Sequence, residues 1–508
     1  MVFEAEDNEG RGEGRQGFGA SHSTVEAGEP APGDPVEGRG CRIMEPLEGK
    51  MTGTSSPENV STKLQRVAKL SREKPEMVWT TLSHLIDIDL LREAYRLTRK
   101  NGAVGVDGQT AREYADNLES NLQSLLARFK SGRYKAPPVL RVHIPKGDGG
   151  KQTRPIGIPT FEDKVLQRAV VMVLESVYEE DFLDCSYGFR PGRSPHQALE
   201  YLRNELWRMR GGFVLEVDLR SFFDTLDHGH LRNILDKRVR DGVIRWVIDK
   251  WLKAGVLEGR VIERSDLGTP QGGVVSPLLS NIFLHEVLDT WFKKEVKPRL
   301  NGPAFLVRYA DDFVLVFADL RDAQRVMAVL PKRMGRFGLA LHPDKTKLVN
   351  FKHPAWCGYK RPGSVPGKPG SFDLLGFTHF WGKSRNKGKW ITKRKTARKR
   401  LTQALKKVAA WCRINRHLPP VMQHRQLSLK LRGHYQYYGI TGNSRGLNCF
   451  YHEVRRLWFK WLKRRNGRRG FTWDRYVIML RRFPLPLPLP VHSVVRTQLV
   501  RDTRSRMR

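Results

Sequence analysis

The chain has few cysteines, and their spacing excludes two kinds of small-domain architecture. Five cysteines are spread over 508 residues, and no two of them form a C-x-x-C pair. The sequence therefore predicts neither a zinc site built on paired cysteines nor a disulfide framework. Such cysteine usage is typical of a reducing cytoplasm. The five positions are Cys41, Cys185, Cys357, Cys412 and Cys449.

Long hydrophobic runs are also missing. No stretch approaches the roughly 20 apolar residues that cross a bilayer. The N-terminus does not show the basic segment followed by an apolar one that marks a secretory signal. We therefore expect a soluble intracellular protein that is neither secreted nor bound to a membrane.

Acidic residues are scarce outside the first 60 positions. The whole chain has 90 Lys and Arg and 53 Asp and Glu, a formal net charge of +37. Residues 1–60 contain 5 basic and 12 acidic residues, so the remaining 448 carry 85 basic against 41 acidic side chains, a difference of +44. An excess this large repels itself unless a polyanion offsets it, which favours a nucleic-acid partner over a merely solvated charged surface.

The first 60 residues have the composition of a disordered segment. They are rich in Gly, Glu, Pro and Ser and show almost no apolar periodicity. Such a segment buries too little apolar surface to offset the entropy of ordering, so we predict a disordered leader over 1–60. The sequence does not decide whether translation starts at Met1, Met44 or Met51.

Two apolar runs in residues 305–317 meet at a pair of adjacent acids, Asp311 and Asp312, which predicts a β-hairpin with carboxylates at its tip. Another apolar run, 213–217, ends at Asp218. Neighbouring buried anions are costly unless a cation neutralises them. Two-metal phosphoryl transfer needs carboxylates from separate strands, and Mg²⁺ prefers such ligands. The three acids therefore predict a site for two Mg²⁺ ions, whereas the hairpin alone would be read as an ordinary Asp-rich turn.

These motifs, with Gly268–Asn281 between them, resemble the palm of reverse transcriptases. The likeness is greatest to the proteins encoded within bacterial group II introns, which combine reverse transcriptase and maturase functions. Residues 101–108 are similar to a glycine-rich motif near the N-terminus of that family. The resemblance covers about residues 85 to 483 and implies an α+β right-hand polymerase, with fingers, palm and an α-helical thumb.

The resemblance divides the chain into four predicted segments. They are the leader 1–60, the fingers and palm 61–380, a basic α-helical thumb or maturase domain 381–483, and a Pro-rich segment with a basic tail 484–508. Residues 381–400 contain ten Lys and Arg and no acid, which predicts a stretch too repulsive to fold on itself and suited to phosphates. The C-terminal DNA-cutting (HNH) domain of many relatives is not expected, since neither the length nor the cysteine spacing allows it.

The resemblance implies which side chains contact the incoming dNTP. Lys146 and Arg154, on a predicted hairpin over 139–159, would bind the triphosphate. Phe223 would lie beneath the sugar and reject a 2′-hydroxyl by steric exclusion. The alternatives are solvated charges at the strand ends and, for Phe223, an ordinary core position.

Two further contacts follow from the same resemblance. Gln271 would touch the nucleotide or the template. Lys345 would lie near the triphosphate and act as general acid toward pyrophosphate, with Lys347 as a close competitor.

Cations interleaved with aromatics suit RNA, because they stack on unpaired bases while neutralising the backbone. The likeness to the maturase-specific thumb and to a loop around residue 190 implies contact with intron RNA. A helical bundle with a basic outer face, and packing or capping roles for the two loop arginines, fit the same residues. The predicted RNA contacts are Arg190, Arg193, Lys393, Arg394, Lys395, Arg398, Lys399, Arg400, Arg432, Tyr435, Tyr437 and Tyr438.

The sequence therefore predicts an RNA-directed DNA polymerase of the bacterial cytoplasm. It would extend a DNA primer on an RNA template with dNTPs, bind its intron RNA to assist splicing, and copy that RNA into DNA during intron mobility. A host-adopted reverse transcriptase in DNA repair or phage defence, a splicing factor with little polymerase activity, and an RNA-dependent RNA polymerase are the alternatives. The intron, its target site, the oligomeric state, processivity and fidelity are left open.

Overall fold

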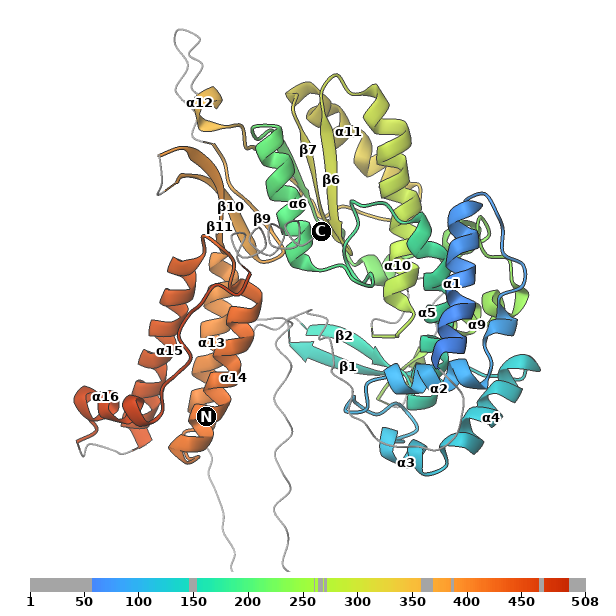
Figure 1. Ribbon diagram of the computed structural model, residues 1–508, viewed down its shortest axis with the longest axis horizontal. Coiled ribbons are helices and arrows are strands. Elements are labelled where there is room, and N and C mark those ends of the chain that lie inside the picture. Colours follow the sequence, from blue (N-terminus) through green and yellow to red (C-terminus); the bar gives the residue numbers. More distant parts are fainter. Residues whose placement is uncertain are drawn as a thin grey trace, which may run out of the picture. The chain divides into compact units, whose positions relative to one another are not determined.

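The structure is a computed structural model that describes residues 57–145, 153–259, 261–263, 268, 272–357, 369–384, 388–465 and 470–492. Helices and three separate sheets alternate along the chain (Figure 1), in agreement with the predicted α+β class. The predicted leader up to residue 56 and the predicted basic tail from residue 493 lie outside the described residues, as do Lys146 and Gln271.

The N-terminal half is organised around a long buried helix, α5 (Phe161–Asp181). Thr160 caps it, because its hydroxyl accepts a hydrogen bond from the amide of Asp163. Most of the apolar residues of this helix are buried. The helices before it are α1 (Pro57–Glu73), α2 (Ile88–Leu97), α3 (Ala111–Asp116) and α4 (Leu118–Lys130).

The first sheet contains the hairpin predicted over 139–159. Strand β1 (Val139–Pro145) pairs antiparallel with β2 (Thr153–Ile158), which confirms it. On its other side β1 pairs in parallel with β4 (Val256–Glu258), which in turn pairs with β5 (Val261–Glu263).

The central sheet has the strand order β6-β7-β3-β8 and every neighbouring pair is antiparallel. Its strands are β3 (Phe213–Val217), β6 (Ala304–Tyr309), β7 (Asp312–Phe317) and β8 (Lys347–Asn350). The predicted strand 213–217 and the predicted hairpin of residues 305–317 are therefore confirmed.

Both faces of the central sheet are covered, because side chains alternate between them along each strand. Leu215 and Leu315 belong to the larger core together with α10 (Ser276–Leu284) and α11 (Leu320–Gly335). Val214 and Val316 point the other way, into a core shared with α6 (Pro195–Arg208). Val275 is the N-cap of α10, since its carbonyl accepts hydrogen bonds from the amides of residues 278 and 279.

The third sheet corrects the prediction that residues 381–400 cannot fold on themselves. Strands β9 (Phe372–Leu374), β10 (Phe377–Lys383) and β11 (Trp390–Thr396) form an antiparallel sheet. The repulsion is relieved because the cations spread over both faces: Arg394 is buried beside Glu200, and the Lys395 ammonium lies over the Phe380 ring. Strand β10 also runs across residue 380, the predicted end of the palm.

Four helices form a C-terminal bundle: α13 (Arg398–Ile414), α14 (Pro420–Tyr438), α15 (Ser444–Arg465) and α16 (Trp473–Arg482). Trp458 and Tyr476 lie in its core. Residues 484–490, predicted to be an extended Pro-rich segment, form neither helix nor strand. They pack on the bundle through Leu485.

Short elements complete the described chain. They are α7 (Phe222–Thr225), α8 (His228–Leu235), α9 (Gly242–Leu252), α12 (Pro354–Cys357), the π-helical turns His285–Thr290 and Phe292–Val296, and the 3-10 turns Ser83–Leu85 and Lys297–Arg299. Within the described ranges, every helix is too short or too polar to cross a bilayer.

Candidate active site

The central sheet brings Asp218 to the same end as the acidic pair. Val217, the last residue of β3, lies opposite Phe313 of β7. Continuing that antiparallel register by one residue places Asp218 beside Asp312, the first residue of β7. Residues far apart in the sequence thus meet through strand pairing, as the sequence predicts.

The turn that carries Asp311 has an unusual backbone. Ala310 has a φ of 56°, in the left-handed region that L residues rarely adopt. Gly188 packs against this turn so closely that an added Cβ would lie 2.3 Å from the Ala310 nitrogen. The Asn281 side-chain amide donates a 2.6 Å hydrogen bond to the Gly188 carbonyl. The left-handed turn is therefore held by a loop and a helix outside the hairpin.

A buried ion pair supports the turn from below. Arg308, on β6, contacts Asp289 at 2.6 Å, and neither side chain is exposed to solvent. The same guanidinium donates to the Asn281 side-chain carbonyl at 2.8 Å and to the Ala310 carbonyl at 3.2 Å. Because a buried guanidinium needs its donors satisfied, the network fixes the backbone just before Asp311.

We did not predict this network from the sequence, although a signal for it exists. Arg308 interrupts an otherwise apolar strand whose residues are all buried. A cation at such a position requires a buried anion. The sequence offers no way to choose Asp289 among the acids of the chain, because its partner comes from a different element, the turn His285–Thr290.

Lys345 forms an ion pair with Asp218. The Asp218 side chain is 27% exposed and that of Lys345 is 59% exposed, so the pair faces solvent. The His342 amide donates a 2.8 Å hydrogen bond to the Asp218 carbonyl, which anchors the lysine's loop beside β3. Lys347 instead lies opposite Glu216, which is two residues before Asp218 on the chain. Of the two competing lysines, Lys345 is therefore the one at the acids.

Glu216 adds another acid to this end of the sheet. It lies two residues before Asp218 and so on the same face of β3. Burial, followed by the nearby charge of Asp373, raises the pKa of Glu216 to about 7. Its carboxyl is therefore partly protonated near neutral pH.

The predicted dNTP contacts are only partly described. Arg154 is half-buried on β2, opposite Ile144. Phe223 is half-buried in α7, and its ring centroid lies 5.4 Å from that of Phe222, a core residue. Phe223 thus packs against the main core with its side chain only partly buried. Gly272, next to the undescribed Gln271, packs against β2: an added Cβ would lie 2.4 Å from the Gly157 carbonyl oxygen.

Two of the predicted RNA contacts lie inside the protein. The Arg190 side chain is 4% exposed, pairs with Glu179 and donates to two backbone carbonyls. Arg394 is buried beside Glu200. The position of Arg190 favours the packing alternative for that loop arginine, and the burial of Arg394 speaks against its predicted RNA contact. Arg193 pairs with Asp184 at 2.7 Å.

The three tyrosines of α14 lie at the junction of the bundle and the third sheet. Tyr435 is buried, and the Tyr437 hydroxyl donates to the Leu375 carbonyl at 2.9 Å. Tyr438 packs on Phe377. Lys393 is half-buried. The predicted RNA contacts that are exposed are Lys395, Arg398, Lys399, Arg400 and Arg432.

The acids have the right chemistry for Mg²⁺, since carboxylate oxygens are its preferred protein ligands. In the described part of the chain, no three His, Cys, Asp or Glu side chains are grouped closely enough to hold an ion as they stand. Lys345 instead supplies the positive charge beside Asp218.

Comparisons with known proteins cover the part of the chain that contains Asp218, Asp311 and Asp312. Residues 144–379 match the family model "Reverse transcriptase (RNA-dependent DNA polymerase)". The chain is 39% identical over 226 residues to the group II intron-encoded protein LtrA of Lactococcus lactis subsp. cremoris, which covers 44% of this chain and 37% of LtrA. It is 32% identical over 144 residues to nuclear intron maturase 1, mitochondrial, of Arabidopsis thaliana, covering 27% of this chain and 19% of that protein.

A third relative is matched over most of its length. Protein YkfC of Escherichia coli strain K12 is 33% identical over 325 residues, covering 57% of this chain and 84% of YkfC. The chain spans little more than a third of LtrA, by contrast. With the reverse transcriptase match and the intron-encoded relatives, this extent of similarity shows that the chain belongs to the group II intron reverse transcriptase and maturase family.

Proposed function

We propose that the chain is an RNA-directed DNA polymerase whose catalytic residues are Asp218, Asp311 and Asp312. The observation that carries this proposal is the pairing of β3 with β7, which sets Asp218 beside Asp312. The buried support under the turn adds to it, because a rigid scaffold is what a catalytic constellation needs. The family match covers the same residues.

In the proposed reaction, the 3′-hydroxyl of a DNA primer attacks the α-phosphorus of a dNTP, and pyrophosphate leaves. Two Mg²⁺ ions held by Asp218 and Asp311, with Asp312 in support, would neutralise charge on the attacking and leaving oxygens. Lys345 is placed beside Asp218, where its ammonium would give a proton to the departing pyrophosphate. Lys146 and Arg154 would bind the triphosphate, Gln271 would touch the nucleotide or template, and Phe223 would exclude a 2′-hydroxyl.

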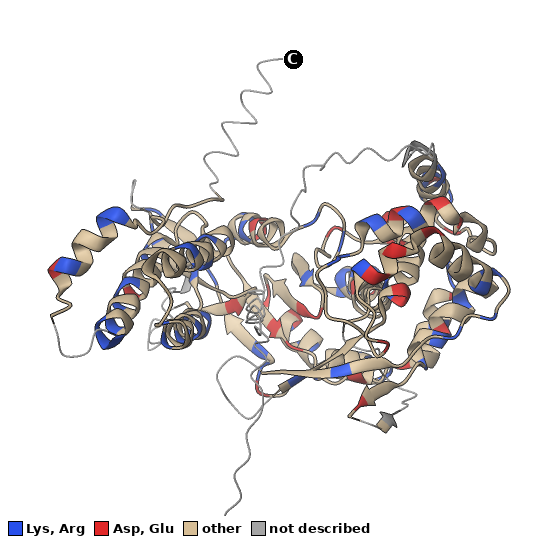
Figure 2. Cartoon of the chain, turned by 90° about the horizontal axis from the view of Figure 1, so that it is seen from below, with Lys and Arg blue, Asp and Glu red and all other residues tan. Residues whose placement is uncertain are grey.

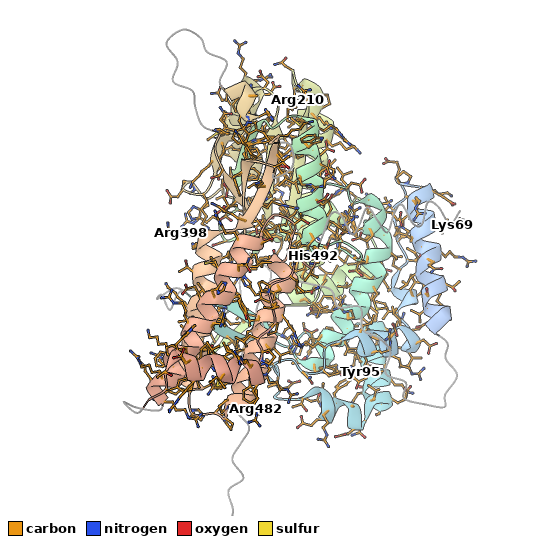
Figure 3. The ribbon with its side chains drawn as sticks, turned by 60° about the vertical axis from the view of Figure 1, so that its left-hand side comes forward. Lys69, Tyr95, Arg210, Arg398, Arg482 and His492 are labelled. Atoms are coloured by element: carbon orange, nitrogen blue, oxygen red, sulfur yellow. The ribbon has the colours of Figure 1, made fainter. Side chains whose placement is uncertain are left out.

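We propose the following domain division. The fingers and palm run from about residue 61 through the third sheet, to Thr396. The thumb is the helical bundle that begins at Arg398, the first residue of α13 (Figure 3). This differs from the boundary at 380 because β10 crosses that position.

The bundle supports a second role, binding the chain's own intron RNA to assist splicing. Residues 398–492 contain 22 Lys and Arg but only two acids, Glu453 and Asp474. Figure 2 shows basic positions along these helices with few acidic ones. A surface of this composition binds phosphates by releasing counterions.

The polymerase proposal is tested with Asp218→Asn and Asp311→Asn, which keep shape but remove charge. Extension of a DNA primer on an RNA template in Mg²⁺ should fall by about 10³-fold or more for each variant. RNA binding should be kept. Asp116→Asn, at an exposed acid away from the site, is the matched control and should extend like the parent. Extension by both site variants at the parental rate would remove the assignment.

The RNA-binding role is tested by neutralising three exposed cations together, in Arg398→Gln, Lys399→Gln and Arg400→Gln. The slope of log affinity for RNA against log salt should become shallower by about 2 to 3, since each phosphate contact contributes about 0.7 to 0.9. The proposal expects splicing assistance to fall with it. An unchanged slope would show that these cations do not contact phosphate.

A further inference from the structure

A hollow of about 870 Å³ lies at the far end of β3 from the catalytic acids. Helix α6 ends beside it, and Figure 3 labels Arg210, which follows that helix. β3 itself, five residues long, separates the hollow from Asp218 by about 16 Å. We call the hollow the tryptophan pocket. Its lining residues are Asn204, Trp207, Arg208, Arg210, His353, Trp381, Lys389 and Trp390.

We propose that the tryptophan pocket binds unpaired nucleotides of a single-stranded nucleic acid, with a base stacked on its indoles and a phosphate beside its cations. This goes beyond the proposed polymerase site, since no catalytic residue lines the pocket. It does not depend on the polymerase proposal.

The aromatic lining is the first argument. Trp207 is 60% exposed on the last turn of α6, although burying an indole stabilises a fold substantially. Trp381 and Trp390 face the same hollow from the third sheet. Trp381 is itself buried and Trp390 is half-buried, so Trp207 and Trp390 supply the indole surface on which a base can stack regardless of sequence.

The charge of the lining is the second argument. Arg208, Arg210 and Lys389 surround the hollow, and none of its described lining residues is acidic. Arg208 does pair with Glu205, but its side chain stays 76% exposed and can still reach a phosphate. Burial and the charge of Arg210 lower the pKa of His353, so this ring is neutral and packs edge-on against Trp381 at 4.9 Å. The positive charge of the lining therefore comes from Arg208, Arg210 and Lys389.

The walls of the pocket are fixed before any ligand binds. The Phe351 amide donates to the Gly212 carbonyl at 2.8 Å, and the His353 amide donates to the Arg210 carbonyl at 3.0 Å. The Trp381 indole donates to the Phe351 carbonyl at 3.0 Å. A preformed pocket loses little conformational entropy on binding, which favours affinity.

The size of the hollow fits this occupant. Binding sites for small molecules have volumes of about 300 to 1,000 Å³ and are lined mostly by apolar side chains. This hollow is at the upper end of that range and combines indoles with three cations, so it suits a base that carries its sugar and phosphate. The described lining offers no acidic side chain that could pair with basic residues of a protein partner. Such a partner would also need acidic residues of its own to match the arginines of the pocket.

The experiment uses the full chain carrying Asp311→Asn, so that binding is measured without polymerisation. Oligonucleotides of 5-iodouridine RNA and 5-iododeoxyuridine DNA, each single-stranded, are crosslinked by light, and the modified peptides are identified by mass spectrometry. We expect a crosslink at Trp207 or Trp390, with the RNA and DNA arms showing which strand is bound. Duplex of the same sequence should give none there.

Two matched variants then separate stacking from packing. Trp207→Leu should weaken the affinity for the crosslinked single strand by about fivefold or more, measured without light, whereas Trp207→Phe should keep most of the affinity because a ring remains. Crosslinks that map only to the helical bundle or the central sheet would overturn the proposal. Equal loss in both variants would also overturn it, since the ring would then not be the contact.

Discussion

Arg308 and Asp289 form a 2.6 Å ion pair in which neither side chain is exposed, directly beneath the turn that carries Asp311. Removing one member of such a pair leaves the other charge buried without compensation, which costs about 3 to 5 kcal/mol. We therefore expect Asp289→Ala to lower the free energy of unfolding by that amount, as measured by urea denaturation. The double variant Asp289→Leu with Arg308→Met should recover most of the stability, because no charge is then left unpaired. A single variant as stable as the parent would contradict this.

The contact between Gly188 and Ala310 predicts a change in activity larger than the change in stability. A Cβ in Gly188→Ala would lie 2.3 Å from the Ala310 nitrogen and would push the turn that carries Asp311. Because a small misplacement of catalytic groups costs about 10²-fold in rate, primer extension should fall by about that factor. Gly335→Ala is the matched control, since no atom lies within 4 Å of its new Cβ. Equal activities in the two variants would show that the turn tolerates the shift.

The pairing of Lys345 with Asp218 distinguishes the two candidate lysines. If Lys345 is the general acid, Lys345→Gln should slow single-nucleotide incorporation by about 10² or more, the usual contribution of such a group. Lys347→Gln should have a much smaller effect, because Lys347 lies opposite Glu216. Rapid-quench kinetics with saturating dNTP would measure the chemical step. The reverse order of the two effects would move the role to Lys347.

Two buried histidines, His379 and His434, and the half-buried His196 predict loss of stability in acid. Burial lowers the pKa of His196 to about 4, of His379 to about 3 and of His434 to about 4, whereas each has its ordinary value near 6.5 when unfolded. The unfolded chain therefore takes up protons first as pH falls below about 6.5. The free energy of unfolding is therefore highest above that pH and declines until the pH reaches the pKa values of the folded protein. Each histidine lowers it by about 1.4 kcal/mol per unit of difference between its unfolded and folded pKa.

A variant isolates one of these groups. His434 stacks on Phe450 at 3.7 Å, and its Nε2 has no hydrogen-bond partner among the residues that the structure describes. His434→Phe should keep the stacking and flatten the decline of stability between pH 6.5 and 4, as followed by urea denaturation. His452, which is exposed, gives the control substitution. An unchanged pH dependence in His434→Phe would mean that this histidine does not titrate on unfolding.

The strands of the central sheet were predictable because their side chains carry the signal locally. Residues 213–217 and 305–317 are apolar runs that end at acids, so both the strands and the meeting point of the acids follow from the sequence. The support beneath them was not predictable. Which acid pairs with Arg308 depends on how a distant turn packs, and nothing local to Asp289 marks it.

Two predictions from charge show why composition alone misleads. The ten cations of 381–400 seemed too repulsive to fold, yet Lys383, Lys393, Arg394 and Lys395 lie in paired strands, and Arg394 is buried beside Glu200. Arg190 belongs to a loop predicted to contact RNA, yet its guanidinium forms an ion pair with Glu179 and donates hydrogen bonds to two backbone carbonyls. A count of charged residues does not say which of them form ion pairs inside the folded protein and which stay free to bind RNA.

The connection from the third sheet to the bundle is a single residue, Ala397, and its amide donates to the Gly376 carbonyl at 2.9 Å. Asn443, at the start of α15, also bonds to both the backbone and the hydroxyl of Thr396. Strand β11 is thus joined directly to the helices of the bundle, without a hinge between them. In the proposed polymerase, the growing RNA–DNA hybrid would have to move along a fixed helical bundle at each cycle of addition. The bundle would not move with the hybrid.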